Sequence, residues 1–145
     1  MPTLTATRKL EVQLMVDHPT LPSSELARIL TLPADEYWDV GQSYKPAPTS
    51  SQQRYQFSRW ALRTVVGCLD ELPDAIRVMT TRIQGIEQQF RLLPSDSTVS
   101  LTLFATEIDT VIGMGLDAET VNLLARIRAG IEISLVVTSG DGVAE

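Results

Sequence analysis

Apolar and polar residues alternate along four stretches of the chain, and each stretch predicts a β-strand. These are residues 9–17, 55–63, 98–106 and 131–137. Alternation with a period of two is typical of a strand with one buried face. In the last stretch we expect Ile131, Ile133, Leu135 and Val137 to be buried.

Three other stretches carry the spacing of amphipathic helices. Residues 23–32 follow Pro22 and end at Pro33, because proline does not continue a helix. A third helix begins after Asp117, a good N-cap, and we expect Gly130 to end it. Its apolar stripe is Val121, Leu124 and Ile127. The second and longest helix has an unbroken heptad stripe with Pro73 in its first turn: Leu69, Leu72, Ile76, Met79, Ile83, Ile86 and Phe90.

These elements predict an α/β fold, more specifically an α+β two-layer sandwich. Four strands in one sheet would have three helices on one face, in the order β-α-β-α-β-α-β. We expect a single domain over residues 1–145 with its core at about 9–137. Residues 42–53 are rich in Pro, Ser, Thr and Gln and predict a loop, and residues 138–145 predict a flexible tail.

Composition narrows the class of protein. Of the 145 residues, 43% are hydrophobic and 21% charged, which is typical of a globular chain. The net charge of −6 argues against general nucleic-acid binding, which requires a basic surface. We find no signal-peptide pattern and no membrane-spanning stretch, so we expect a cytoplasmic protein that contacts no membrane. The lone Cys68 allows no internal disulfide, and we expect no cofactor.

The order of motifs resembles a known family. A strand and a short helix ending at Leu32-Pro33 precede the segment Tyr37–Gly41, which reads Tyr-Trp-Asp-Val-Gly. A strand with Trp60-Ala61-Leu62, a long helix, and a strand-helix-strand finish with Leu123-Leu124-Ala125 follow. This resembles the small bacterial proteins of domain-of-unknown-function family 4279 over about residues 9–137. The resemblance implies a compact bacterial α/β domain and transfers no catalytic residue.

Candidate chemistry is sparse, and we predict no catalytic residue. Asp17 and His18 follow the first strand, and Glu107 and Asp109 follow the third. If those strands are parallel neighbours, the four side chains meet at one sheet edge and could bind a metal; otherwise they are solvated strand ends. Cys68 precedes the long helix and is either a small buried side chain or a thiol activated by the helix dipole.

The sheet face without helices is the most informative surface. Alternation places the following residues on it: Glu11, Gln13, Met15, Arg59, Ala61, Arg63, Ser100, Thr102, Phe104, Glu132, Ser134 and Val136. Trp60 is expected in the core, whereas Trp38 is either a lid over the core edge or an anchor for a partner. The candidate partner-binding residues are Tyr37, Trp38, Tyr44, Met15, Arg59, Arg63 and Phe104.

The leading hypothesis is a non-enzymatic protein-binding module of a bacterial cytoplasm. One form is an immunity-type protein that neutralises a toxin, since an acidic chain suits a basic partner. The alternatives are a small metal-dependent enzyme and a sensor domain that binds a small ligand near Trp38 and Tyr44. The long helix serves either as core or as the seam of a homodimer.

Overall fold

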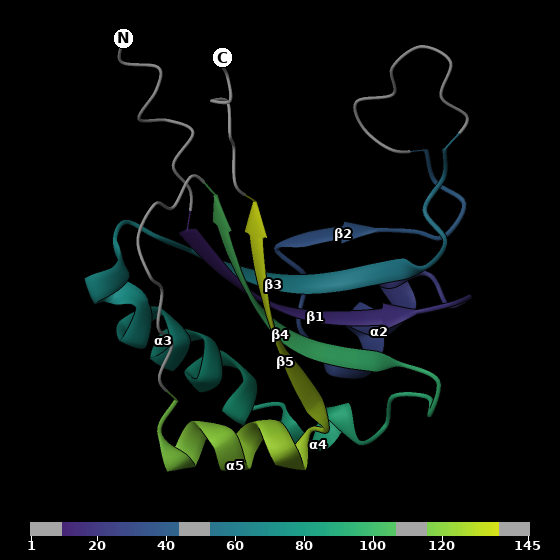
Figure 1. Cartoon of the computed structure of the whole chain (residues 1–145). Coiled ribbons are helices and arrows are strands. Elements are labelled where there is room, and N and C mark those ends of the chain that lie inside the picture. The colour runs from purple at the N-terminus through teal and green to yellow at the C-terminus, as the bar shows by residue number, and fades with distance from the viewer. Residues whose placement is uncertain (1–9, 44–52, 107–115, 137–145) are drawn as a thin grey trace, which may run out of the picture.

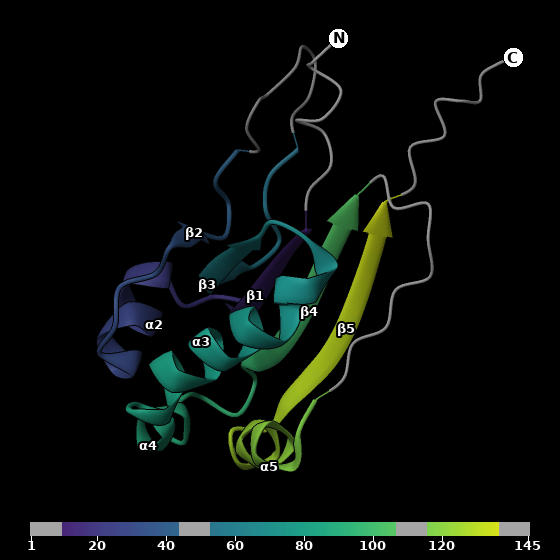
Figure 2. The same cartoon turned by 90° about the vertical axis from the view of Figure 1, so that its left-hand side faces the viewer.

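A computed structural model describes residues 10–43, 53–106 and 116–136, and these residues form one sheet with helices on one side (Figures 1 and 2). The α/β class and the single sheet are therefore confirmed, although strand and helix counts differ from the prediction. The elements, in chain order, are β1 (Leu10–His18), α2 (Ser23–Leu30), β2 (Glu36–Trp38), β3 (Ser58–Val66), the 3-10 turn η1 (Leu69–Glu71), α3 (Leu72–Gln84), α4 (Glu87–Phe90), β4 (Thr98–Thr106), α5 (Ala118–Arg126) and β5 (Ala129–Val136).

The sheet has the strand order β2-β3-β1-β4-β5, with β1 in the middle (Figure 1). β1 is antiparallel to both of its neighbours: Leu14 lies opposite Leu62 of β3 on one side and Leu101 of β4 on the other. β2 is antiparallel to β3, whereas β5 is parallel to β4. The parallel pair needs a crossover, which passes through α5.

The core lies between the sheet and the helices. One side of β1 contributes Leu10, Val12, Leu14 and Val16, which are 5% exposed or less. α3 packs against β1 and β3, and α2 packs against β3, so the helices cover this face (Figure 2). Trp60 is fully buried there; its indole N–H donates to the Leu32 carbonyl at 2.8 Å and its ring meets Phe90 edge-on.

Two strand predictions need correction. β2 was not predicted: it lies between the predicted helix 23–32 and the predicted loop 42–53, and it pairs with only three residues of β3. β3 spans Ser58–Val66 rather than 55–63. A three-residue strand is too short to show a period of two, so its pairing with β3 was invisible in the sequence.

The long helix is divided, which corrects the prediction of an unbroken stripe. α3 ends at Gln84, Ile86 leaves the helical conformation at φ −124°, and α4 begins at Glu87. Gly85 weakens the helix at this point, and α4 turns to pack against α2. Pro73 does lie in the first turn of α3, as predicted, and the apolar side of α3 belongs to the core.

The C-terminal unit confirms one prediction and corrects others. The Asp117 carboxylate accepts the backbone N–H of Thr120 at 2.8 Å and caps α5. Gly130 does not end α5: the helix stops at Arg126, and Gly130 lies within β5. Ile131 and Ile133 are about half exposed, at 47% and 51%, because β5 is an edge strand beyond the helices over β1 and β3. Val121 is also exposed; Leu135 and Val137 have no described side chain.

The connection between β3 and α3 corrects the expectation for the cysteine. Cys68 is exposed, so it is not a small buried side chain. Its carbonyl accepts the N–H of Glu71 in the turn that leads into η1. Within the described ranges, none of the helices is long and apolar enough to cross a membrane.

Candidate functional site

The sheet face opposite the helices is called the open face here, since no described helix packs on it (Figures 1 and 2). The strand register assembles it in rows across the sheet. Gln13, for example, lies between Arg63 of β3 and Thr102 of β4, and Thr102 lies beside Glu132 of β5. The described face consists of Trp38, Glu36, Arg59, Ala61, Arg63, Val65, Glu11, Gln13, Met15, Asp17, Thr98, Ser100, Thr102, Phe104, Gly130, Glu132 and Ser134.

An aromatic cluster occupies one corner of the open face. The Trp38 ring stacks on Tyr55 with centroids 4.1 Å apart and lies 6.0 Å from Phe57. The guanidinium of Arg59 lies over both Trp38, at 4.7 Å, and Phe57, at 5.2 Å. These are cation–π distances, so the guanidinium interacts with both aromatic rings.

Arg59 is also fixed by an acid on the neighbouring strand. Its Nε and Nη2 donate to the two carboxylate oxygens of Asp17 at 2.7 and 2.8 Å. Both side chains are about one-fifth exposed. A bidentate pair that is partly shielded from water holds its geometry more firmly than a surface ion pair. The corner is therefore a preorganised surface of aromatic and arginine groups.

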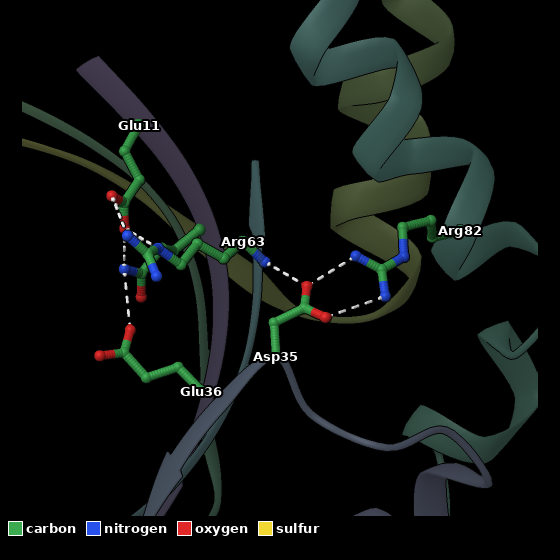
Figure 3. A network of polar contacts seen from close by, with 6 residues as sticks. Glu11, Asp35, Glu36, Arg63 and Arg82 are labelled. Atoms are coloured by element: carbon green, nitrogen blue, oxygen red, sulfur yellow. Dashed lines mark hydrogen bonds and ion pairs between the residues drawn. The ribbon is translucent and has the colours of Figure 1, made fainter. Parts of the chain in front are cut away.

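A second polar network lies at the centre of the face (Figure 3). Arg63 donates from Nε to Glu11 Oε2 at 2.9 Å and from Nη2 to Oε1 at 3.2 Å. The Gln13 amide donates to Glu11 and, at 3.3 Å, to Glu36 of β2. The network thus joins three strands, and the Glu11 carboxylate holds the pKa of Arg63 above its ordinary value.

Asp35 extends this region towards the helices. Its carboxylate accepts the backbone N–H of Arg63 at 2.9 Å and the guanidinium of Arg82 on α3 at 2.7 Å. These contacts, led by the one from Arg82, lower the pKa of Asp35 from its ordinary value. Figure 3 shows Asp35 between the two arginines. The same carboxylate therefore links the sheet edge to α3.

The centre of the open face is more buried than the sequence pattern indicates. Glu11, Gln13 and Met15 are 7% exposed or less, so β1 is buried on both faces rather than half-buried. Thr102 is 1% exposed, and its hydroxyl has no hydrogen-bond partner among the described residues. Contact with solvent is consequently concentrated at the margins of the face, where Val65 is 62% exposed and Glu132 is exposed.

The structure brings together five of the seven predicted partner-binding residues. Trp38, Arg59, Arg63, Met15 and Phe104 all lie on the open face. Met15 is 4% exposed, however, so it supports the face and does not offer an apolar contact.

The remaining two candidates are not on the described face. Tyr37 pairs with Trp60 and points to the side opposite Trp38; it is 64% exposed at the sheet edge. Tyr44 lies outside the described residues.

Part of the Tyr37–Gly41 motif has a structural role. The Asp39 carboxylate accepts both the N–H and the hydroxyl of Ser23, at 2.7 and 2.8 Å, at the first residue of α2. The N-cap position of that helix is Pro22, which offers no capping side chain. Asp39 therefore caps α2 from a distant segment and fixes the end of β2 beside Trp38.

His18 is a buried, fully bonded side chain rather than a solvated strand end. Its Nδ1 accepts the backbone N–H groups of Thr20 and Leu21 at 3.0 and 2.9 Å. Its Nε2 therefore carries the proton and donates to Asp96 at 2.8 Å. The ring ties the turn after β1 to the turn before β4.

The four-residue metal site required the first and third predicted strands to be parallel neighbours, and they are not parallel. β1 and β4 are antiparallel, with Asp17 opposite Thr98, so the last residue of β4 and His18 lie at opposite ends of the strand pair. Glu107 and Asp109 themselves lie outside the described residues. Among the residues described, no group of three or more His, Cys, Asp or Glu side chains is placed to bind a metal.

Sequence reasoning missed Tyr55, Phe57 and Glu36 as members of the site. Tyr55 and Phe57 lie in the predicted strand 55–63 at alternate positions with Arg59, but they were not among the predicted candidates, and β3 itself begins only at Ser58. Their aromatic character close to Arg59 in the chain is the signal that could have found them.

Comparison with known proteins yields no match to a family model, to a curated protein or to a solved structure. The resemblance to domain-of-unknown-function family 4279 therefore stays a prediction.

Proposed function

We propose that the chain is a non-enzymatic protein-binding module whose partner binds the open face of the sheet. The observation that carries the proposal is the corner where Trp38, Tyr55, Phe57 and Arg59 are locked together by stacking and by the Asp17 carboxylate. Tryptophan, tyrosine and arginine dominate binding energy at protein interfaces. Because these side chains are already fixed, little conformational entropy is lost on binding.

The charge of the face supports a basic partner. The open face carries four carboxylates and two guanidinium groups. The carboxylates belong to Glu11, Asp17, Glu36 and Glu132, and the guanidinium groups to Arg59 and Arg63. The face is therefore acidic overall, in keeping with the net charge of −6 for the chain. An acidic surface accelerates association with a basic protein and weakens in salt.

An immunity-type protein that neutralises a basic toxin of the same bacterial cytoplasm is the concrete form of this proposal. Such a role needs a stable surface rather than a catalytic centre. The described residues fit that requirement, because the open face is made of side chains paired to one another across strands.

The test starts from the full chain as a tagged bait in its native host, followed by affinity measurements on the captured protein. Val65→Lys and Glu132→Lys each place a positive charge at the exposed margin of the open face without touching the buried network. We expect each substitution to weaken binding by about tenfold, because repulsion between like charges opposes association with a basic partner.

Val78→Lys is the matched control. Val78 is 52% exposed on α3, on the helix side of the molecule, whereas Val65 is 62% exposed on the open face. The control should leave the affinity unchanged. The proposal fails if the bait captures no protein, or if Val78→Lys weakens binding as much as Val65→Lys.

A further inference from the structure

A pocket of about 480 Å³ lies on the helix side of the molecule, at the end of the sheet where β4 and β5 begin. Its volume falls in the range of about 300 to 1,000 Å³ that is usual for small-molecule sites. Phe90 and Ile127 contribute buried apolar surface, and Leu93 and Pro94 are half-buried in the wall. It is called the arginine pocket below, and its lining is Phe90, Arg91, Leu93, Pro94, Ser95, Ser97, Val99, Arg126, Ile127 and Arg128.

The charge of the arginine pocket is opposite to that of the chain. Its lining holds Arg91, Arg126 and Arg128 and no carboxylate, although the chain as a whole carries a net charge of −6. Glu87, which is not part of the lining, interacts with two of these arginines. Its Oε2 accepts a hydrogen bond from Arg126 Nε at 2.7 Å and lies 3.8 Å from Arg91 Nη2. One acid therefore faces two of the three guanidinium groups, and the pocket retains an excess of positive charge.

Arg128 has a free side chain among the described residues. Its guanidinium makes no hydrogen bond or ion pair within that part of the chain, and the residue is exposed. Arg128 also has a left-handed backbone, with φ at 59°, just after the C-cap residue Ile127 of α5. Glycine is favoured at this position of a helix end, and a residue with a side chain is strained there. Arg128 therefore occupies a position that glycine would suit better.

A polar side chain in the wall of the pocket also has no hydrogen-bond partner in the described part of the chain. The Ser97 hydroxyl is shielded from water and has no hydrogen-bond partner among the described residues, which is rare for a buried polar atom.

We propose that the arginine pocket binds a small phosphorylated molecule, with its phosphoryl group held by Arg126 and Arg128 and its organic body lying against Leu93 and Pro94. Guanidinium groups match the oxygens of a phosphoryl group with two parallel hydrogen bonds. The volume exceeds what inorganic phosphate alone would fill, so a sugar phosphate or nucleotide fits better. This site lies on the helix side and is independent of the protein partner proposed for the open face.

Calorimetric titration of the full chain tests the proposal with four probes: adenosine monophosphate, ribose 5-phosphate, inorganic phosphate and adenosine. We expect saturable binding of at least one of the two organic phosphates, weaker binding of inorganic phosphate, and none of adenosine. Arg128→Gly should reduce the affinity about tenfold or more, because a charged hydrogen bond is lost. The same variant should raise the thermal midpoint, because glycine suits the left-handed backbone.

Two controls separate these effects. Thr31→Gly relieves a second non-glycine left-handed position of the described residues, at φ 57° after α2, and should raise the thermal midpoint without changing the affinity. Arg28→Ala removes an exposed arginine that pairs with Glu25 and should leave the affinity unchanged. Absence of saturable binding of both organic phosphates at about 10 mM overturns the proposal, since such affinity is weaker than a specific site provides. Equal loss in Arg28→Ala and Arg128→Gly also overturns it.

Discussion

Arg59 and Asp17 lie on adjacent strands and form a bidentate pair, with N–O distances of 2.7 and 2.8 Å. Asp17→Asn removes the charge of the acceptor and leaves the guanidinium, which lies over Trp38 and Phe57, without its counter-ion. We expect the free energy of unfolding to fall by about 1 to 2 kcal/mol, as for hydrogen bonds to charged groups. Urea denaturation followed by circular dichroism measures the change.

The control for this pair is Asp74→Asn on α3. Asp74 pairs with Arg77, and both side chains are about two-thirds exposed or more. Exposed pairs contribute little, so this substitution should change the free energy of unfolding by less than about 0.5 kcal/mol. A loss as large as that of Asp17→Asn would show that the shielding of the Arg59 pair has no energetic importance.

His18 is expected to be essential for the turn after β1. His18→Ala removes the acceptor for two backbone N–H groups and leaves space at a position that is 4% exposed. We predict a loss of about 2 kcal/mol or more, since unpaired buried donors are costly. Asp96→Ala removes only the acceptor for His18 Nε2. The Asp96 side chain is 60% exposed, so the loss in the free energy of unfolding should be less than about 1 kcal/mol. Equal losses from the two variants, measured by urea unfolding, would contradict this division of roles.

Asp35 gives the fold a specific sensitivity to acid. Its pKa is lowered in the folded state below the ordinary 3.8, chiefly by Arg82, so its contribution to stability is complete above that value. The contribution is lost as the pH falls from there through the lower folded-state pKa. Asp35→Asn should therefore be less stable than the wild type at neutral pH, and the difference should shrink below about pH 4. Thermal midpoints from about pH 6 to about pH 2.5 measure it; a constant difference would show that ionisation of Asp35 is not the cause.

Two glycines offer a matched test of backbone conformation. Gly85 has helical angles, φ −72° and ψ −14°, and a methyl group built there meets no atom within 4 Å. Gly85→Ala should therefore stabilise the protein by about 0.5 to 1 kcal/mol. Gly41 has equal space but a φ of +87°, so Gly41→Ala should destabilise it. Both effects are measured as changes in the urea midpoint. Effects of the same sign would contradict the helical conformation of Gly85 or the left-handed conformation of Gly41.

The alternation of residues predicted most of the sheet because it depends only on which face each side chain takes. β4 occurs at 98–106 as expected, and the open-face positions of Glu11, Arg59 and Phe104 follow from the same period. The cap at Asp117 was readable because its geometry is local to four residues.

The predictions that were wrong concerned features that depend on tertiary neighbours. The exposure of Ile131 and Ile133 follows from the place of β5 at the sheet edge, which no local pattern encodes. The pairing of Arg59 with Asp17 depends on the register of β3 against β1, and the metal hypothesis depended on the direction of β4 relative to β1; neither can be read from a local pattern. Side-chain membership of a face was therefore predictable, whereas the partners within it were not.

The central position of β1 in the sheet has a consequence for how the chain folds. β1 comes first among the described strands, yet both of its partners, β3 and β4, follow much later, and Leu10 pairs with Ala105. The middle of the sheet therefore closes only after long loops have been formed, and each closure costs entropy before any contact is gained. We therefore expect this chain to fold more slowly than a helical bundle of the same length and to leave the apolar face and both backbone edges of β1 uncovered until β3 and β4 pair with it.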